Sequence, residues 1–283
     1  MTIQPSEIRN YFTLIKETIV SKKGMAVCLA VALCGANVLA VGILGTPTAE
    51  LEQNKWDLGF NYMYSTQDLA KTNTVFGDVG GVQAVDKMKI RDFNVQRYYL
   101  TVGYGVTEWW EVYVQIGVAD TKMKTQFEGQ PDWNSFNFDN DMVWGLGTRL
   151  TVAEQDKVKW GFTAQMNWFD TELTEKNVFV AGDRDKHMID GFDFFAAFGP
   201  TVDMGGWNLY GGPFYYCLNG DFENKYTAPG DPLFKETGNL RQKSHLGGFI
   251  GAQFDLCPNT KMNVEFSGTP DGWAVGTGVA YTF

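Results

Sequence analysis

The last eleven residues, Trp273-Ala-Val-Gly-Thr-Gly-Val-Ala-Tyr-Thr-Phe283, decide how the rest of the chain is interpreted. Bulky, mostly apolar residues alternate there with small ones, and the bulky face carries an aromatic residue at each end. A strand of a soluble sheet would normally bury its large face and show charge on the other, but this strand has no charge. A bulky face toward lipid, with aromatics at both interfaces and small residues toward a crowded interior, explains the pattern.

The same period-2 alternation recurs through most of the chain and predicts strands of about ten residues, the length of a tilted membrane crossing. Short turns alternate with long polar loops between these strands until the last loop. The sequence therefore predicts one all-β domain, a transmembrane antiparallel up-and-down β-barrel of about ten strands. The predicted strands cover residues 56–65, 97–106, 110–119, 142–152, 158–169, 188–202, 207–218, 244–254, 261–267 and 273–283.

Tryptophans lie close to the ends of the predicted strands, and Trp133 alone lies within a loop. Tryptophan favours the headgroup depth of a membrane, whereas in a soluble protein it would be expected mid-strand in a core. The distribution predicts aromatic girdles at the two interfaces. Their members are Trp56, Trp110, Trp144, Trp160, Trp168, Trp207, Trp273 and Tyr281.

The chain ends on aromatics at alternate positions, with Val279, Tyr281 and Phe283 on one face. This ending resembles the C-terminal signal of bacterial outer-membrane β-barrel proteins, which include porin-like and small OmpA-type barrels. The resemblance covers residues 55–283 as a pattern and specific residues only at the C-terminus. It implies that the barrel assembly machinery recognises the last strand. It also implies location in the outer membrane of a Gram-negative-type bacterium, in contact with outer-membrane lipid.

The N-terminal region has the parts of a secretory signal. Lys22 and Lys23 precede an apolar run that ends in small residues, which predicts a signal peptide over residues 1–40, cleaved after about Ala40. Residues 41–54 then form a short periplasmic lead, and residues 55–283 form the barrel. Two alternatives remain: an uncleaved anchor over residues 25–44, and translation that begins at Val20.

Composition narrows the choice of partners. The net charge of −10 is unsuited to nucleic acid, so no nucleic-acid partner is expected. No cofactor and no metal site are predicted, because the acidic segments at residues 139–141 and 219–223 lack the spacing of a defined calcium loop. These acidic loops are instead candidates for loose contact with divalent cations.

Polar residues on the predicted inner face form the candidate site: Arg97, Glu111, Arg149, Lys159, Asp193 and Glu265. Glu111, Arg149 and Lys159 lie on consecutive predicted strands near the periplasmic end, where an ion-pair cluster is expected. Such a cluster could line a constriction or an ion path. The alternative is that a barrel this small is filled by its own side chains, whose charges must pair because they are desolvated. The second interpretation is favoured.

No catalytic residues are predicted. The two histidines, His187 and His245, would lie near the outer rim, where omptin-like proteases work, but the paired-acid pattern of those enzymes is absent. The leading hypothesis is a non-enzymatic barrel, either a structural, surface-exposed protein or a narrow porin-like channel. The alternatives are a rim-active hydrolase, omptin-like or lipid-modifying, and a soluble periplasmic β-barrel binding protein. The hydrolase would require an Asp or Glu within hydrogen-bond reach of a histidine.

Two details test the strand assignment. Pro213 falls inside a predicted strand whose aromatics occupy both faces, so a β-bulge is expected there. Cys217 and Cys257 should lie at opposite ends of the barrel, too far apart for a disulfide.

Overall fold

A computed structural model describes residues 44–78, 83–176, 184–228 and 231–283. The chain divides into two compact units, Met1–Val38 and Leu39–Phe283, and all described residues belong to the second. The predicted signal peptide lies outside the described residues and stays a prediction. Within these ranges the structure contains no helix long and apolar enough to cross a bilayer.

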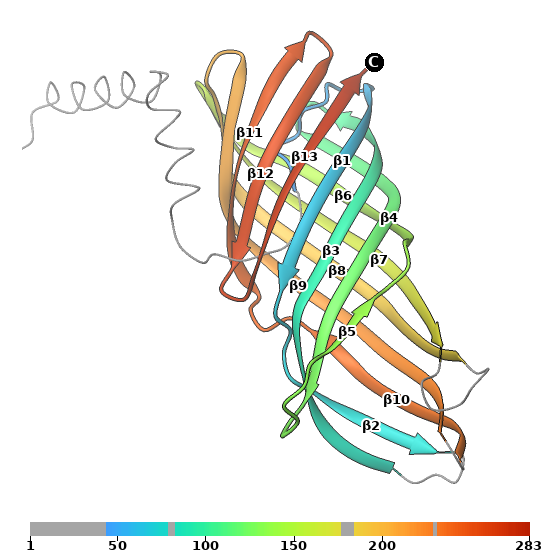
Figure 1. The fold of residues 1–283 in the computed structure, drawn as a ribbon. Coiled ribbons are helices and arrows are strands. Elements are labelled where there is room, and N and C mark those ends of the chain that lie inside the picture. Colours follow the sequence, from blue (N-terminus) through green and yellow to red (C-terminus); the bar gives the residue numbers. More distant parts are fainter. Residues whose placement is uncertain (1–43, 79–82, 177–183, 229–230) are drawn as a thin grey trace, which may run out of the picture. The chain divides into compact units, whose positions relative to one another are not determined.

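The described residues form a single antiparallel sheet of thirteen strands (Figure 1). The strands are β1 Trp56–Gln67, β2 Thr72–Asp78, β3 Gln83–Thr107, β4 Trp110–Phe127, β5 Asn134–Asn137, β6 Asp141–Gln155, β7 Val158–Lys176, β8 Arg184–Asp203, β9 Trp207–Ala228, β10 Asp231–Arg241, β11 Leu246–Cys257, β12 Thr260–Thr269 and β13 Gly272–Thr282.

Ten of these strands close into a barrel, in the order β1-β3-β4-β6-β7-β8-β9-β11-β12-β13 and back to β1. The first and last strands complete the ring in unbroken register, from Asp57 opposite Thr282 to Gln67 opposite Gly272. A ring of this kind leaves no sheet edge unpaired, which is the condition for a sheet to stand in lipid. The predicted closed antiparallel barrel of ten strands is confirmed.

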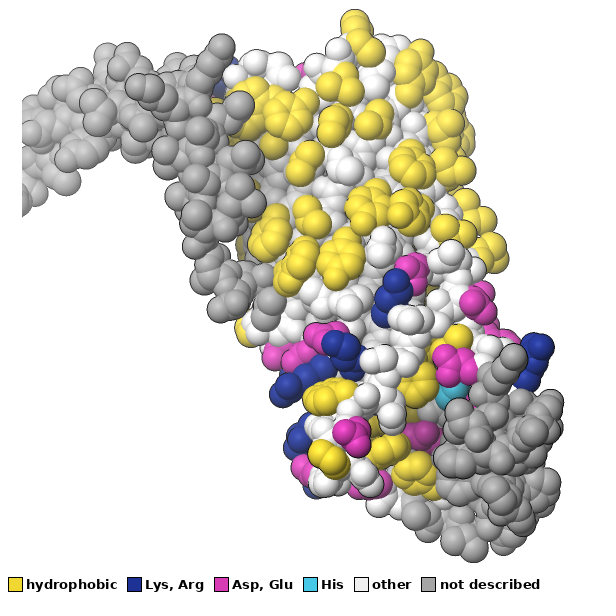
Figure 2. Space-filling view, viewed as in Figure 1, with side chains coloured by type: hydrophobic (Ala, Val, Ile, Leu, Met, Phe, Trp, Pro, Cys, Tyr) yellow, Lys and Arg dark blue, Asp and Glu magenta, His cyan; other side chains and the backbone are white. Residues whose placement is uncertain are grey.

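The outer surface of the barrel carries the apolar residues. On β13, the bulky residues Val275, Val279 and Tyr281 are exposed. Ala274, on the opposite face with the small residues of the same strand, is buried. Figure 2 shows hydrophobic side chains spread over the upper part of the view and charged side chains gathered in the lower part. An apolar surface of this extent needs lipid to cover it. Other members of this exposed band are Leu58, Phe60, Leu100, Val114, Ile116, Trp144, Leu146, Phe198, Ile250 and Val264.

Several strands run past the ends of their neighbours and build a second β-structure, which we call the extension. It consists of β2, β5 and β10 with residues 83–93, 120–127, 170–176, 184–190 and 219–228. Here β2 and β10 bridge β3 to β9, and β5 pairs with β4. Long connections are extracellular in outer-membrane barrels. We therefore call the end with the extension the outer end and the end with the short turns the periplasmic end.

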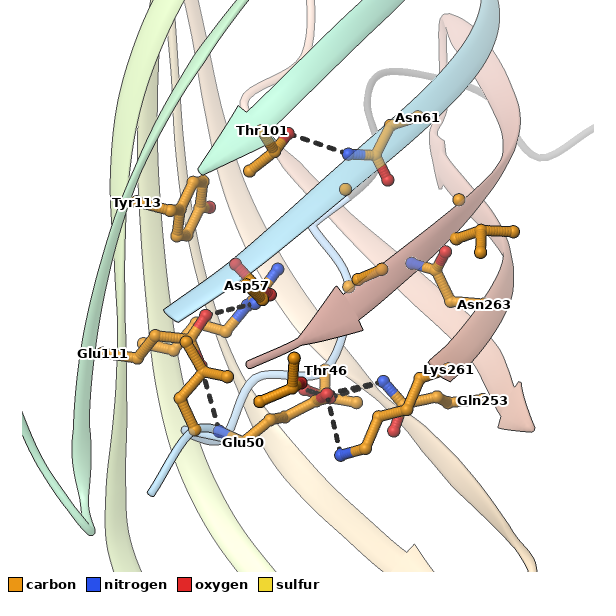
Figure 3. A pocket seen from close by; sticks show the side chains of 18 residues that line it. Thr46, Glu50, Asp57, Asn61, Thr101, Glu111, Tyr113, Gln253, Lys261 and Asn263 are labelled. Atoms are coloured by element: carbon orange, nitrogen blue, oxygen red, sulfur yellow. Dashed lines mark hydrogen bonds and ion pairs between the residues drawn. The ribbon is translucent and has the colours of Figure 1, made fainter. Parts of the chain in front are cut away.

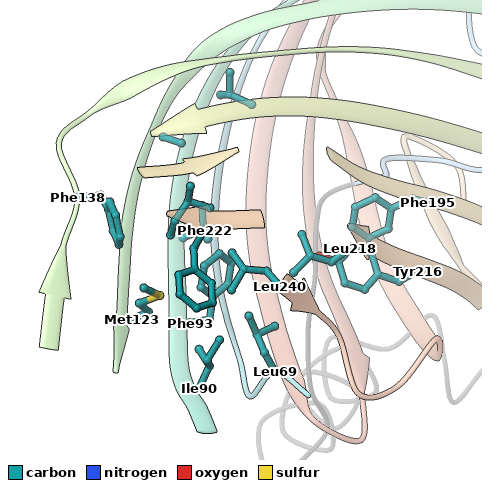
Figure 4. Packing of buried hydrophobic residues seen from close by; sticks show 14 of the residues in the cluster. Leu69, Ile90, Phe93, Met123, Phe138, Phe195, Tyr216, Leu218, Phe222 and Leu240 are labelled. Carbon is teal, nitrogen blue, oxygen red and sulfur yellow. The ribbon is translucent and has the colours of Figure 1, made fainter. Parts of the chain in front are cut away.

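The prediction of long polar loops is wrong for most of these residues. Alternation continues in them with inward apolar side chains such as Met88, Ile90, Phe222 and Leu240, each at most 2% exposed. Figure 4 shows Ile90, Phe222 and Leu240 on the inner side of the sheet, together with Leu69 and Leu218, and Met88 belongs to the same buried cluster. Burial of this apolar surface stabilises strands that no membrane supports.

Pro213 does not produce the expected bulge. The register of β9 with β8 is the same on both sides of it, with Ala197 opposite Phe214 and Thr201 opposite Tyr210. Instead the ladder between these strands is interrupted at the intervening residues, where proline lacks a donor. The aromatic residues around Pro213, which could not be assigned to one face from the sequence, are divided between the two faces of β9. Tyr210, Phe214 and Tyr216 are buried, and Tyr215 is exposed.

Candidate functional site: the barrel lumen

An ion pair crosses the middle of the lumen. Arg97 on β3 lies 2.6 Å from Asp193 on β8, and their side chains are 7% and 0% exposed. Three strands separate β3 from β8 one way around the ring and five the other way, so the pair joins opposite walls. Asn167 donates a further hydrogen bond to Asp193, at 2.5 Å. These side chains therefore span the lumen at this level.

A second ion pair lies nearer the periplasmic end. Arg149 on β6 lies 2.6 Å from Glu111 on the neighbouring strand β4, and Glu111 is 1% exposed. The predicted third member, Lys159, is not part of this cluster. It lies beside the β6–β7 turn, where its exposed amine is 3.5 Å from Glu154. Residues at the strand ends reach solvent, so the inner-face pattern does not hold for Lys159.

Residues 44–51, which precede β1, lie inside the periplasmic half of the lumen. We call them the lumenal segment; apart from Glu50, which is partly buried, all of its residues are buried. The backbone amides of Leu44 and Gly45 donate to the two oxygens of Glu265 on β12, at 2.9 and 3.0 Å. From the sequence, a short periplasmic lead is predicted over these residues, because an irregular segment has no periodic pattern that marks it as buried.

Ala49 and Glu50, near the end of the lumenal segment, contact early strands of the barrel as well as late ones. The Glu50 amide donates to Glu111 at 3.0 Å, and the Ala49 amide donates to Thr151 at 3.1 Å. The Glu50 carboxylate accepts from Gln253 at 2.7 Å and lies 3.3 Å from the Lys261 amine. Figure 3 shows Glu50 between the Gln253 and Lys261 side chains, with Thr46 also bonded to it.

Little free space remains inside. A cavity of about 60 Å³ lies between the lumenal segment and the wall near Asp57 and Asn61, and another of about 40 Å³ lies beside Arg97. Each can hold only a few water molecules. In the described part of the chain, an apolar core, the Arg97–Asp193 pair and the lumenal segment occupy much of the lumen.

The histidines were the candidates for an enzyme site. His187 Nδ1 lies 2.9 Å from the amide oxygen of Asn224, whose amino group donates to Glu236 in turn. His245 Nδ1 lies 2.5 Å from the Gln242 amide nitrogen and 3.1 Å from a backbone carbonyl. The partners found are thus amides and a carbonyl, rather than the carboxylate that a hydrolase would require.

The pKa values of three acidic side chains in the extension are shifted by burial and by neighbouring charges. Burial raises the pKa of Glu236, whose Oε1 has no hydrogen-bond partner among the described residues. Hydrogen bonds from Lys225 and Lys235 lower the pKa of Glu223 on the surface. Burial and the neighbouring carboxylate of Asp221 raise the pKa of Asp190.

The acidic segments proposed for cations have partners within the protein. Asp141 accepts a backbone hydrogen bond from Glu172 at 2.8 Å, and Asp221 accepts one from the Asn239 side chain at 2.5 Å. Among the described residues no group of three or more His, Cys, Asp or Glu side chains is arranged to hold a metal ion. Cys217 and Cys257 are free thiols, on β9 and at the periplasmic end of β11.

The predicted girdle residues lie in two zones of the outer surface. Trp144 and Trp168 stack with ring centroids 4.3 Å apart, near the end of the barrel that continues into the extension. At the periplasmic end Trp56 packs on Tyr104, and Phe283 exchanges backbone hydrogen bonds with Trp56. Trp110, Trp160, Tyr281 and Phe283 are exposed there, Trp207 is half-buried at the same end, and Trp273 is half-buried near the outer end of β13.

No known family profile matches the sequence, and no curated protein matches it significantly. Among solved structures, outer-membrane proteins are similar to this chain at low identity and low TM-score. The outer-membrane protein OprG of Pseudomonas aeruginosa is 10% identical with a TM-score of 0.46, over 86% of this chain and 99% of that one. The outer-membrane protease OmpT of Escherichia coli is 10% identical with a TM-score of 0.41, over 80% and 97%. The outer-membrane protein AlkL is 13% identical with a TM-score of 0.37, over 88% and 96%.

Likenesses this distant say nothing about activity. The ring of strands, the lipid-facing band and the closing aromatic strand define the class: the chain is a transmembrane β-barrel of the outer-membrane type. Fold does not fix function, so function has to be argued from the lumen and the extension.

Proposed function

We propose that the protein is a closed, non-conducting barrel of the outer membrane that anchors the extension at the cell surface, and that it is not an enzyme. One observation carries this proposal: the buried Arg97–Asp193 pair joins opposite walls of the lumen. A porin-like channel needs a continuous aqueous path, and the cavities beside the lumenal segment and beside Arg97, about 60 and 40 Å³, are each too small to pass a solute.

The extension supports a surface role. Its strands are stabilised by an apolar core of their own rather than by lipid, and their outer faces carry most of the charge seen in Figure 2. Exposed rigid strands with charged, well-paired side chains can present a defined surface to partners outside the cell. The lipid-facing band, the girdles and the C-terminal aromatic support export and location in the outer membrane.

The proposal is tested by conductance of the purified protein in a planar bilayer. Folding is first verified by a mobility difference between unheated and boiled samples on a gel. The wild type should give no stepwise conductance. A variant with Arg97→Ser and Asp193→Ser serves as comparison, and Lys122→Ser, which removes only an exposed ion pair with Asp120, serves as the matched control. Steps from the folded wild type would overturn the proposal in favour of a narrow channel.

A further inference from the structure

We propose that the periplasmic half of the lumen is a peptide-binding site, and that the lumenal segment occupies it as a separable ligand of the same chain. This inference goes beyond the proposed function, because a closed barrel could equally be filled by wall side chains alone. The ligand class is a peptide of irregular conformation that offers two consecutive backbone amides and, five residues after the second, a carboxylate.

The walls recognise backbone groups at the start of the lumenal segment. Both oxygens of Glu265, which is 3% exposed, accept hydrogen bonds from the Leu44 and Gly45 amides. Arg149 donates to the Leu44 carbonyl at 3.3 Å. A buried carboxylate is costly unless it is hydrogen-bonded, so removal of the segment would leave Glu265 without these two donors. The wall is thus built for an occupant.

Further along, the contacts are specific to side chains. The Thr48 hydroxyl donates to Thr201 at 2.9 Å, and the Glu50 carboxylate is bound by Gln253 and Lys261. The wall also makes room: a side chain at Gly161 would meet the Pro47 carbonyl. Only glycine leaves that space, which indicates a wall shaped around the segment.

The contacts lie on both sides of the closure between β1 and β13. Glu111, Thr151 and Thr201 belong to β4, β6 and β8, whereas Gln253 and Lys261 belong to β11 and β12. The segment directly precedes β1, the strand that completes the ring with β13. A bound segment therefore ties the early strands to the last ones, and its loss should weaken the closed barrel.

The test places a specific protease site in the exposed stretch 52–55, between the lumenal segment and β1, in the otherwise complete chain. The folded protein is cut in detergent micelles and passed over a gel-filtration column. We expect the cut peptide to stay with the barrel. Addition of chaotrope below the barrel's unfolding midpoint should then release it and lower the temperature at which the gel mobility shifts. A peptide that leaves at once, from a barrel that keeps its folded mobility, would overturn the proposal.

Specificity is measured with synthetic peptides of residues 44–54 added to the emptied barrel after the chaotrope is removed, so that every peptide is compared on the same barrel sequence. A Glu50→Gln peptide should bind roughly 10- to 100-fold more weakly than the natural one, because it loses charge-assisted bonds to Gln253 and Lys261. A Glu52→Gln peptide changes an exposed residue and should bind like the natural one. Equal affinity of the Glu50→Gln and natural peptides, or of a scrambled peptide, would contradict recognition by the walls.

Discussion

Replacement of Arg97 by methionine removes the positive partner of Asp193 and retains much of the side-chain volume. Asp193 is fully buried, so the substitution leaves its carboxyl group without a cationic partner and with Asn167 as its remaining side-chain donor. Breaking a buried ion pair from one side costs about 3–5 kcal/mol, because an uncompensated charge stays in a poorly solvated place. We expect Arg97→Met to lower the free energy of unfolding by about that amount.

The double variant, Arg97→Met with Asp193→Leu, removes both charges. Apolar replacements of a buried pair are often neutral or stabilising by about 1–4 kcal/mol, so the double variant should recover most of the loss. The assay is urea titration in phospholipid vesicles, with the folded fraction read from the mobility of unheated samples. Lys122→Met, at an exposed pair, is the control and should change stability by less than about 1 kcal/mol. A small cost for Arg97→Met, with no recovery in the double variant, would refute the reasoning.

Three further predictions concern other parts of the molecule. Burial raises the pKa of Glu236, so the folded extension favours the protonated acid. The contribution of this preference to stability is fully present below the pKa of the unfolded state and is lost as pH rises through the pKa of the folded state. Glu236→Gln should therefore weaken the pH dependence of protease resistance in the extension between acidic and neutral pH, while Asp190, whose pKa is also raised, retains part of it; an unchanged profile would count against the prediction. Val114→Lys puts a charge in the middle of the lipid-facing band and should cost about 2–4 kcal/mol in the same urea titration, whereas a negligible cost would argue that this face does not meet lipid. Gly251→Val would press on the buried Tyr210 ring and should cost about 1–3 kcal/mol, while Gly248→Ala, which meets only ordinary contacts, should be tolerated; equal costs would contradict the packing described.

The strands of the barrel were predictable because period-2 alternation is local. Each residue of β13, for example, reports whether its own side chain meets lipid or the lumen, and no distant information is needed. The separation of the two unpaired cysteines and the positions of the girdle residues follow from the same rule. The extension was missed because Gly77 and the polar residues around it resemble loop sequence. The inward residues of the extension, such as Ile90 and Leu240, are apolar. They alternate with polar residues over stretches too short to stand out as strands in the sequence.

The site was only partly predictable. The sequence indicates that Arg97 and Asp193 face inward, but which charges meet depends on the order of strands around the ring, and these two come from opposite walls. Lys159 was misplaced because strand ends do not follow the inner-face pattern. The lumenal segment carries no periodicity at all. Its Thr, Ala and Gly residues are nevertheless a weak signal, since small side chains suit the inside of a narrow barrel.

The central claim is that the lumen is filled, with the lumenal segment bound inside a closed ring. Amide hydrogen exchange of the folded protein in micelles, read at individual residues, tests it most directly. The account predicts that the amides of Leu44, Gly45, Ala49 and Glu50, which donate to wall side chains, are protected to a degree similar to strand β1. Exchange of these amides at the rate of an unstructured peptide, while the barrel strands stay protected, would contradict the account.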